Sequence, residues 1–483
     1  MPSSVAFHSL LRRGMTGVIS SKTGLEPGSF RDPDSRVFTA DGRVLRLLSE
    51  QGLADWRALS SSGLLDELPV VGTREVKADV PEALHDGVAA VLEHDVIPFV
   101  SYPYEWTFSM LRDAALLQLE LLRRAIEKGL ILKDSTPYNV QFRGGAPVFI
   151  DVGSFEQLRE GEPWAGYRQF CMLFLYPLLL QAWKDVPFQP WLRGSLEGIA
   201  PRELRNLLSA RDLLRRGALS HIVLHDRLER RYEEREADLK GELRKAGFKK
   251  ELILANIRGL ERLIGRLRWE PDRSTWSEYG PHTTYTAEDA EQKARFVADA
   301  AAEEQPRLVW DLGCNDGRHS RIAAEHAEHV VAMDADNLVV DRLYRALRDE
   351  RETRILPLTV NVVDPSPALG WRGQERRPLL DRGRPDLTLA LALVHHVSIS
   401  GNVPVAEFLD WLHGATRSLV IEFVSPEDPM ARRLLARKRP GDHPDYRADW
   451  FEQCLTERFE VVRSEPLSRQ GTARTLYLAR PRA

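Results

Sequence analysis

The stretch VWDLGCNDG, at positions 309–317, has residue types and spacing that could hold a cofactor. It fits the pattern Asp-x-Gly-x-x-x-Gly through Asp311, Gly313 and Gly317, between an apolar strand-like run and a helical one. Glycines at such a turn let the backbone approach a ligand closely, because no Cβ intervenes. A plain strand–helix turn is the alternative interpretation.

Loops that bind phosphate read differently from this one. A dinucleotide-binding loop has the spacing Gly-x-Gly-x-x-Gly, and a Walker-type loop ends in Gly-Lys-Ser/Thr; both patterns are absent here. Asp311 and Asp316 would also repel phosphates. The loop therefore predicts a cofactor whose binding end is positive and carries no phosphate.

Two further acids follow at the expected strand ends. VVAMDAD places Asp334 at the end of the next strand, 23 positions after Asp311. A carboxylate there can accept hydrogen bonds from both hydroxyls of a ribose. LTVNVVD brings Asp364 to the end of the third strand, where it could meet the amino group of an adenine.

Taken in this order, the glycine loop, the two acids and a closing hairpin resemble a class I S-adenosylmethionine-dependent methyltransferase, over roughly residues 275–483. The resemblance implies S-adenosylmethionine as the cofactor. Gly313 and Gly317 would line its methionine part, and Asp311 would hold the loop and approach the amino group through water. Asp334 would hold the ribose, and Val363 and Asp364 would flank the adenine. The implied cofactor-binding set is Asp311, Gly313, Cys314, Asn315, Gly317, Asp334, Ala335, Val363, Asp364 and Tyr285.

The segment before this domain, WSEYGPHTTYTAEDAEQKARFV, resembles the lead-in that closes over such a site. Tyr279 and Tyr285 are its candidate lid residues, and Lys293 is a weaker one. Simple packing of the two aromatic rings is the alternative.

On the acceptor side, His395 and His396 follow the fourth strand run, Asp386–Val394. An imidazole can take a proton from an attacking hydroxyl or amine near neutral pH. One of the pair is the candidate catalytic base, while the other could only pack or form a hydrogen bond. Because adjacent residues of a strand point to opposite faces, we expect no metal site here. Glu422 and Asp428, near the end of the fifth strand, could also face the acceptor.

The N-terminal half carries a second motif, KDSTPYNVQFRGGAPVFIDVGSF. Asp134 and Asn139 have the Asp-x-x-x-x-Asn spacing of a kinase catalytic loop, and Asp151 follows a strand where a kinase places its metal-binding Asp. The segment resembles the C-terminal lobe of aminoglycoside phosphotransferase-like kinases. Three features of such kinases are missing. Lys133 and Leu132 precede Asp134, where a His or Gly is customary, and residues 1–100 contain no convincing glycine-rich loop and no clear lysine on a third strand. An inactive kinase-like scaffold, an active phosphotransferase and a coincidental spacing all stay open.

Bulk properties narrow the class of protein. The chain has 483 residues and a net charge of −4, so its charge gives no support to a nucleic-acid partner. Three widely separated cysteines argue against a disulfide framework and suit a reducing cytoplasm. No secretory signal is evident. The most apolar stretch, residues 170–183, is too short to span a bilayer and contains Pro177, so we expect a buried helix and no membrane partner.

The elements that must position these residues fall into three regions. Residues 1–215 form a kinase-like or accessory α+β domain, residues 216–270 a charged helical connector, and residues 271–483 the methyltransferase domain. Alternating strand and helix signals in the last region predict a Rossmann-like, mostly parallel seven-stranded sheet with helices on both faces. The strand runs are 308–312, 329–334, 355–363, 386–394, 418–424, 459–465 and 475–479.

Together these features predict an S-adenosylmethionine-dependent methyltransferase acting on a small metabolite or a glycan. The methylated atom (O, N or C) and the oligomeric state are left open. The segments NVP, PSPALGW and IEFVSPEDPM resemble bacterial methyltransferases related to a host-specific nodulation protein. Two alternatives are a bifunctional kinase–methyltransferase with an ATP- and Mg-dependent N-terminal domain, and a binding protein that only senses the cofactor.

Overall fold

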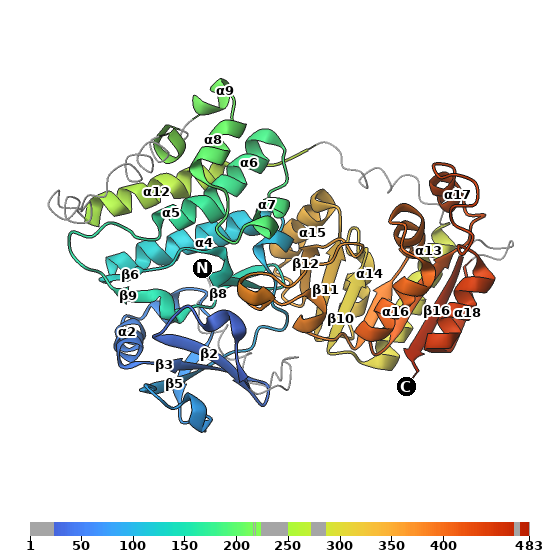
Figure 1. Ribbon diagram of the computed structural model, residues 1–483, viewed down its shortest axis with the longest axis horizontal. Coiled ribbons are helices and arrows are strands. Elements are labelled where there is room, and N and C mark those ends of the chain that lie inside the picture. Colours follow the sequence, from blue (N-terminus) through green and yellow to red (C-terminus); the bar gives the residue numbers. More distant parts are fainter. Residues whose placement is uncertain are drawn as a thin grey trace.

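A computed structural model describes most of the chain, and its two domains lie side by side (Figure 1). The described residues are 24–215, 217, 219–223, 250–271, 286–467 and 474–482.

The N-terminal domain begins with a five-stranded antiparallel sheet in the order β1-β2-β3-β5-β4. A helix, α2, follows β3, and the short α3 leads to β4. The bounds are β1 Gly24–Leu25, β2 Ser35–Ala40, β3 Arg43–Leu48, α2 Glu50–Ser61, α3 Leu64–Glu67, β4 Thr73–Val76 and β5 Ala90–His94.

A helical lobe built around α4 follows this sheet. Thr107 caps α4 by accepting a hydrogen bond from the backbone N–H of Met110, and Gly129, with φ +81°, follows its end as the sequence predicts. Two small hairpin-like pairs, β6–β9 and β7–β8, carry the kinase-like motif. The bounds are α4 Phe108–Glu127, β6 Leu130–Leu132, β7 Val140–Arg143, β8 Ala146–Phe149, β9 Phe155–Gln157, α5 Tyr167–Phe170, α6 Tyr176–Lys184, α7 Gln189–Gly194, α8 Pro201–Leu207, α9 Ala210–Leu213 and α12 Lys250–Arg266, with π-helical turns at Cys171–Leu175 and Leu219–Val223.

A small antiparallel lobe with one long helix, followed by a helical lobe that carries two short strand pairs, is a kinase-like α+β arrangement. The apolar stretch at 170–183 lies across α5, the π turn and α6, and most of it is buried in the lobe, as predicted. Among the described residues no helix has both the length and the apolar character needed to cross a membrane.

The C-terminal domain is a seven-stranded sheet in the order β12-β11-β10-β13-β14-β16-β15, with only the β16 pairings antiparallel. The mostly parallel sheet with a closing hairpin is confirmed. The strands are β10 Leu308–Leu312, β11 His329–Asp334, β12 Ile355–Thr359, β13 Leu387–Ala390, β14 Leu419–Val424, β15 Phe459–Pro466 and β16 Arg474–Pro481; the helices are α13 Ala287–Glu304, α14 Arg318–Ala324, α15 Asn337–Glu350, α16 Val405–Ala415, α17 Pro429–Leu435 and α18 Ala448–Arg458.

Two strands are shorter than the sequence predicts. β12 ends at Thr359 rather than at position 363, and β13 ends at Ala390 rather than at 394. In both places the apolar run continues past the strand, because the residues that follow are buried in loops or helical turns such as Val360 and Val394. An apolar run alone does not mark where pairing stops.

Alternate residues of β10 face two different cores. Val309 packs with α13 and α14 residues such as Phe296 and Ala323, whereas Trp310 belongs to the cluster that continues into the N-terminal domain. The ring of Phe99 meets Trp310 edge-on at 6.2 Å between centroids. The two domains therefore share one continuous apolar core.

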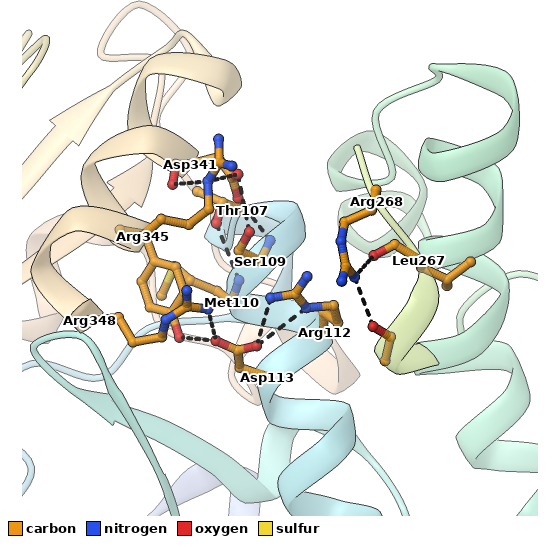
Figure 2. A network of polar contacts seen from close by, with 12 residues as sticks. Thr107, Ser109, Met110, Arg112, Asp113, Leu267, Arg268, Asp341, Arg345 and Arg348 are labelled. Carbon is orange, nitrogen blue, oxygen red and sulfur yellow. Dashed lines mark hydrogen bonds and ion pairs between the residues drawn. The ribbon is translucent and has the colours of Figure 1, made fainter. Parts of the chain in front are cut away.

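Polar contacts between α4 and α15 reinforce this shared core (Figure 2). The backbone N–H and hydroxyl of Ser109 donate to the carboxylate of Asp341 at 2.8 and 3.1 Å. The carboxylate of Asp113 accepts from Tyr344 and Arg348 at 3.0 and 2.9 Å. Buried charge-assisted bonds of this kind fix one relative orientation of the two domains.

Helix α12 of the predicted connector packs along α4. Arg123 pairs with Glu261 at 3.2 Å, and the ring of Trp269 lies 6.3 Å from that of Phe108. This part of the connector thus packs against the N-terminal domain. The domain boundaries given above stay a prediction.

Candidate functional site

The glycine loop lies where β10 turns into α14, at the carboxyl edge of the sheet. Gly313 and Gly317 both have left-handed backbones, with φ of +77° and +79°. The N–H groups of Gly313 and Cys314 both donate to the carbonyl of Met333 on β11. A Cβ on Gly313 would lie 3.3 Å from the side chain of Leu393, so this position is tight as well as left-handed. The sequence and the backbone agree on why glycine is needed here.

The side chains of Asp311 and Cys314, at the start of the loop, are both buried. Asp311 is 2% exposed and accepts a hydrogen bond from the hydroxyl of Ser320 on α14 at 2.5 Å. Burial raises the pKa of Asp311 to about 6, against the lowering effects of Ser320 and Lys293. Cys314 is also buried, and burial raises the pKa of its thiol. The predicted loop-holding role of Asp311 thus has a visible partner, whereas the side chain of Cys314 packs in an apolar core.

Asp334 ends β11 beside the loop. One carboxylate oxygen accepts the backbone N–H of Asn315 at 3.0 Å, and the other accepts that of Asp336 at 2.9 Å. Each carboxylate oxygen has two lone pairs, so the carboxylate keeps acceptor capacity for a further donor. Burial raises the pKa of Asp334, while hydrogen bonds from the backbone N–H groups of Asp336, Asn315 and Ala335 lower it. Ala335 is exposed next to it.

The adenine side differs from the prediction. Asp364 does not end the third strand: it lies five positions beyond Thr359 and forms a bidentate ion pair with Arg193 of α7, at 2.8 and 2.9 Å. Val363 is 39% exposed. The backbone N–H of Val360 donates to the carbonyl of Asp334, so Asn361 is the polar residue that directly follows the paired strand end. The spacing could not reveal Arg193, which is 171 positions away.

The histidine pair also needs a correction. His395 and His396 do not lie on a strand, because β13 ends at Ala390 and a helical turn with a π segment at His396–Ser400 begins here. Their rings therefore lie against each other, with centroids 4.0 Å apart, rather than on opposite faces. Burial lowers the pKa of His396 to about 4 and that of His395 well below its ordinary value. Both imidazoles are neutral at pH 7.

A buried charge network lies near these histidines. Lys293 of α13 pairs with Glu422 at 2.7 Å, and Arg474 pairs with both Glu422 at 3.1 Å and Asp428 at 2.8 Å. Arg474 contributes to lowering the pKa of both histidines. Glu422 and Asp428, expected from the sequence to face an acceptor, are thus bound to Arg474. No sequence signal marked Arg474, because it enters from the last strand.

The two lid candidates, Tyr279 and Tyr285, lie outside the described residues, and their role stays a prediction. The backbone of Ala392, by contrast, carries a signal that the sequence did not: its φ of +51° is unusual for a residue with a Cβ. It lies just after β13, next to Leu393, which packs on Gly313. Such backbone strain often accompanies a functional site.

The arrangement identifies the C-terminal domain by its topology. In the sheet, β10 lies between β11 and β13, so the chain order reverses there, and in open α/β sheets ligands bind beyond the carboxyl ends of the strands at such a point. The glycine loop, Asp334 and the His395–His396 turn all follow strands that end at this edge. With this strand order and loop, the C-terminal domain has the fold of a class I S-adenosylmethionine-dependent methyltransferase.

The kinase-like motif of the N-terminal domain is also assembled in space. Asn139 donates to the hydroxyl of Ser154 at 3.0 Å, and that hydroxyl donates to Asp151 at 2.6 Å. The other oxygen of Asp151 accepts from Arg46 at 2.8 Å. Arg46 lies on β3, where a kinase carries its lysine. The absence of a lysine on this strand agrees with the sequence, in which nothing marked this arginine.

Asp134, the third member of the motif, differs from Asp151 in its surroundings. No hydrogen bond or ion pair to its carboxylate is found among the described residues. Burial raises its pKa, and the negative charge of Asp151 adds to the effect. Asp134 is therefore the carboxylate of this motif that stays available to a ligand.

A cavity of about 440 Å³ separates the two lobes of the N-terminal domain and has the size of a small-molecule site. Apolar side chains from both lobes form one part of its wall: Val37, Val44, Val71, Ile97 and Ile150. Asp134, Asn139 and Asp151 line it as well.

The methyltransferase domain also contributes to this cavity. The segment 375–382, between β12 and β13, reaches across to the N-terminal domain (orange in Figure 1) and supplies Glu375, Arg376, Arg377, Asp381 and Arg382 to the lining. Glu375 pairs with Arg31 at 2.6 Å, and Arg377 pairs with Glu26, both in the connection between β1 and β2. The cavity is thus enclosed by both domains.

Comparison with curated proteins finds the nodulation protein NoeA of Rhizobium meliloti (strain 1021), which is 35% identical over 462 residues. The match covers 94% of this chain and 96% of that protein. It bears out the resemblance carried by PSPALGW and its companion segments. No family model matches the chain.

Among solved structures, the N-methyltransferase NodS from Bradyrhizobium japonicum WM9 matches 40% of this chain and 96% of its own, with 15% identity and a TM-score of 0.30. The bifunctional kinase–methyltransferase WbdD matches 46% of this chain and 46% of its own, with 17% identity and a TM-score of 0.30. Values this low carry no argument, so the fold assignment rests on the strand order and the motifs.

Proposed function

This chain belongs to the family of nodulation protein NoeA, and we propose that it transfers a methyl group from S-adenosylmethionine to a small metabolite or a glycan. The observation that carries the proposal is the position of Asp334 beside the glycine loop, at the point where the strand order reverses. Its carboxylate accepts backbone N–H groups of Asn315, Asp336 and Ala335 and still has a lone pair for a further donor.

The residues present fit this cofactor. Asp334 would accept the ribose hydroxyls, and the left-handed Gly313 and Gly317 would give the methionine part close access to the backbone. Asn315 and Ala335 would border the cofactor from the two loops. The exposed side chains at both positions support this assignment.

When bound, the cofactor supplies a methyl sulfonium, a good electrophile, so the protein itself has little bond chemistry to perform. Its main task is to hold the acceptor in line with the methyl group, which can supply much of the rate. His396 is neutral above about pH 4 and is partly exposed, so it can accept a proton from the acceptor. The fully buried His395, whose ring lies tilted against that of His396, would orient it.

The nature of the acceptor follows from how this edge is charged. Within the described residues, Glu422 and Asp428 are bound to Arg474 and Lys293, so these two acids and two bases balance one another's charge and leave none of the four cationic or anionic groups unmatched for a strongly anionic acceptor. A neutral polyhydroxylated or amine acceptor suits such an edge. This argument favours a glycan or small metabolite over nucleic acid.

The test is isothermal titration of S-adenosylhomocysteine into the full chain and into Asp334→Ala. Losing two charge-assisted hydrogen bonds should weaken binding by roughly 100-fold. Asp349→Ala, which removes an exposed acid from the helix after the same strand, is the matched control and should bind as the wild type does. Wild-type binding that Asp334→Ala leaves unchanged would refute the assignment.

Product formation is the second half of the test. The chain would be incubated with methyl-labelled S-adenosylmethionine and a panel of oligosaccharides, amino sugars and small acids. We expect label in a carbohydrate or amine. Label only in RNA or protein would contradict the acceptor class while leaving the methyltransferase activity intact.

The N-terminal cavity favours a second function, the binding of a purine nucleotide. Its apolar walls from both lobes suit a flat base, and Asp134 and Asn139 lie in the same cavity. Phosphotransfer would further require Asp151 to release Arg46 and hold a metal ion. We therefore propose nucleotide binding without efficient phosphotransfer; magnesium-dependent ATP turnover that Asp151→Ala abolishes would overturn the second part.

A further inference from the structure

One arginine in the N-terminal cavity differs from the others in its partners. Among the described residues of the lining, Arg31, Arg46, Arg377 and Arg382 each bond a carboxylate. Arg376 does not: its Nη1 donates to the backbone carbonyl of Glu375 at 2.8 Å, and its Nε is buried without a hydrogen-bond partner.

The position of Arg376 is set by both lobes. Its guanidinium carbon lies 3.9 Å from the centre of the Tyr138 ring, in the turn that carries Asp134 and Asn139. On the opposite side, a Cβ on Gly28 would lie 3.5 Å from Nη1, so the backbone of the β1–β2 connection is close to this cation. The guanidinium therefore lies close to both the β1–β2 connection and the turn that carries the motif.

We infer that Arg376, although it belongs to the methyltransferase domain, is a ligand-binding residue of the N-terminal cavity and contacts a phosphate of the bound nucleotide. This inference rests on the nucleotide-binding function proposed above. A phosphate near the unpaired carboxylate of Asp134 is repelled by it and needs a nearby cation. Arg46 is already bound to Asp151, whereas the charge of Arg376 is not matched by a carboxylate among the described residues.

The consequence concerns how the site is assembled. Arg376 reaches the cavity only because its segment is fixed at both sides: Ser366 and Arg382 bond the buried Glu105, and Arg377 and Glu375 bond the β1–β2 connection. The nucleotide site is complete only when the two domains are docked. Each domain alone would lack part of it.

The experiment compares two probes, ADP and adenosine, by isothermal titration into the full chain. A guanidinium–phosphate contact is felt by ADP and not by adenosine. Arg376→Gln should weaken ADP binding by about tenfold and leave adenosine binding within about twofold. Arg376→Lys keeps the charge and should keep ADP binding within about threefold of the wild type.

Arg372→Gln is the matched control, because this exposed arginine lies in the same connection between β12 and β13 and does not line the cavity. It should bind both probes as the wild type does, and unchanged S-adenosylhomocysteine binding by every variant shows that the chain is folded. Equal loss of ADP and adenosine binding in Arg376→Gln, or no loss of either, overturns the role of Arg376 and leaves the nucleotide site standing. A wild type that binds neither probe overturns both.

Discussion

The carboxyl edge of the methyltransferase sheet and the cleft of the kinase-like domain both hold an Asp that follows a strand, yet the two carboxylates are in different states. Within the described residues, the carboxylate of Asp334 accepts hydrogen bonds from backbone N–H groups and from no side chain, and it retains acceptor capacity. Asp151 is bound on one oxygen by Arg46 and on the other by Ser154.

A sequence motif thus gives the position of a carboxylate, whereas its partners in the folded chain set whether it can bind a ligand. Backbone donors orient a carboxylate and leave it charged and open, whereas a guanidinium neutralises it. The C-terminal site therefore keeps its ligand-binding capacity. In the kinase-like site Asp151 is occupied by Arg46, and the groups available to a ligand are Asp134 and residues of the other domain.

The largest expected effect comes from breaking the link between the two regions. Arg382 and Glu105 form an ion pair at 2.6 Å in which both side chains are 1% exposed. Arg382→Met leaves the charge of Glu105 buried and uncompensated, so the free energy of unfolding should fall by about 3–5 kcal/mol. Urea unfolding measures it, with the exposed Arg372→Met as the control; equal stability of the two variants would show that the pair does not hold the domains together.

A second effect is a pH dependence of the free energy of unfolding that comes from His396 in the C-terminal domain. The folded pKa of His396, about 4, lies below its ordinary value of 6.5, so between these values the unfolded chain binds more protons and stability is lost as pH falls. At pH 5 this single histidine should cost the wild type about 2 kcal/mol relative to pH 7.5. His396→Gln should lose correspondingly less over the same interval in urea unfolding. His413→Gln, in the same domain, is the control, and parallel pH curves for His396→Gln and the wild type would contradict the prediction.

A third effect sharpens the contrast between Asp334 and Asp151. If Arg46 blocks metal binding, magnesium should change wild-type ADP affinity by less than about threefold. Arg46→Met releases Asp151, and magnesium should then raise ADP affinity by about tenfold, the gain of one charge-assisted contact. Arg43→Met, on the same strand but paired with Glu93, should behave as the wild type. Strong magnesium dependence in the wild type would mean that Asp151 is available after all.

The smallest effect concerns Asp364. Its ion pair with Arg193 is exposed, with 69% of the Asp364 side chain accessible, so Asp364→Ala should lower the free energy of unfolding by less than about 1 kcal/mol. We expect S-adenosylhomocysteine affinity to change by less than about twofold, and a larger loss in Asn361→Ala. A tenfold loss in Asp364→Ala would restore its predicted contact with the adenine.

The sequence by itself determined which elements the C-terminal domain contains and their order, though not where β12 and β13 end. All seven strands of the C-terminal domain, the glycine loop and Asp334 follow from apolar runs, turn residues and acids at strand ends. The kinase-like motif was recognisable from three residues because its spacing is local. Such features can be read because neighbouring residues share one stretch of backbone, whose periodicity and turn chemistry are set locally.

Only the tertiary structure decided which of these residues are available to a ligand. Arg193 reaches Asp364 across 171 positions, Arg46 reaches Asp151 across 105, and Arg376 enters a cavity of the other domain. The contact between the rings of His395 and His396 likewise arises because β13 stops pairing at Ala390, which its apolar run did not indicate. Spacing along the chain carries no information about such partners, because they are brought together by the packing of distant segments against a shared core.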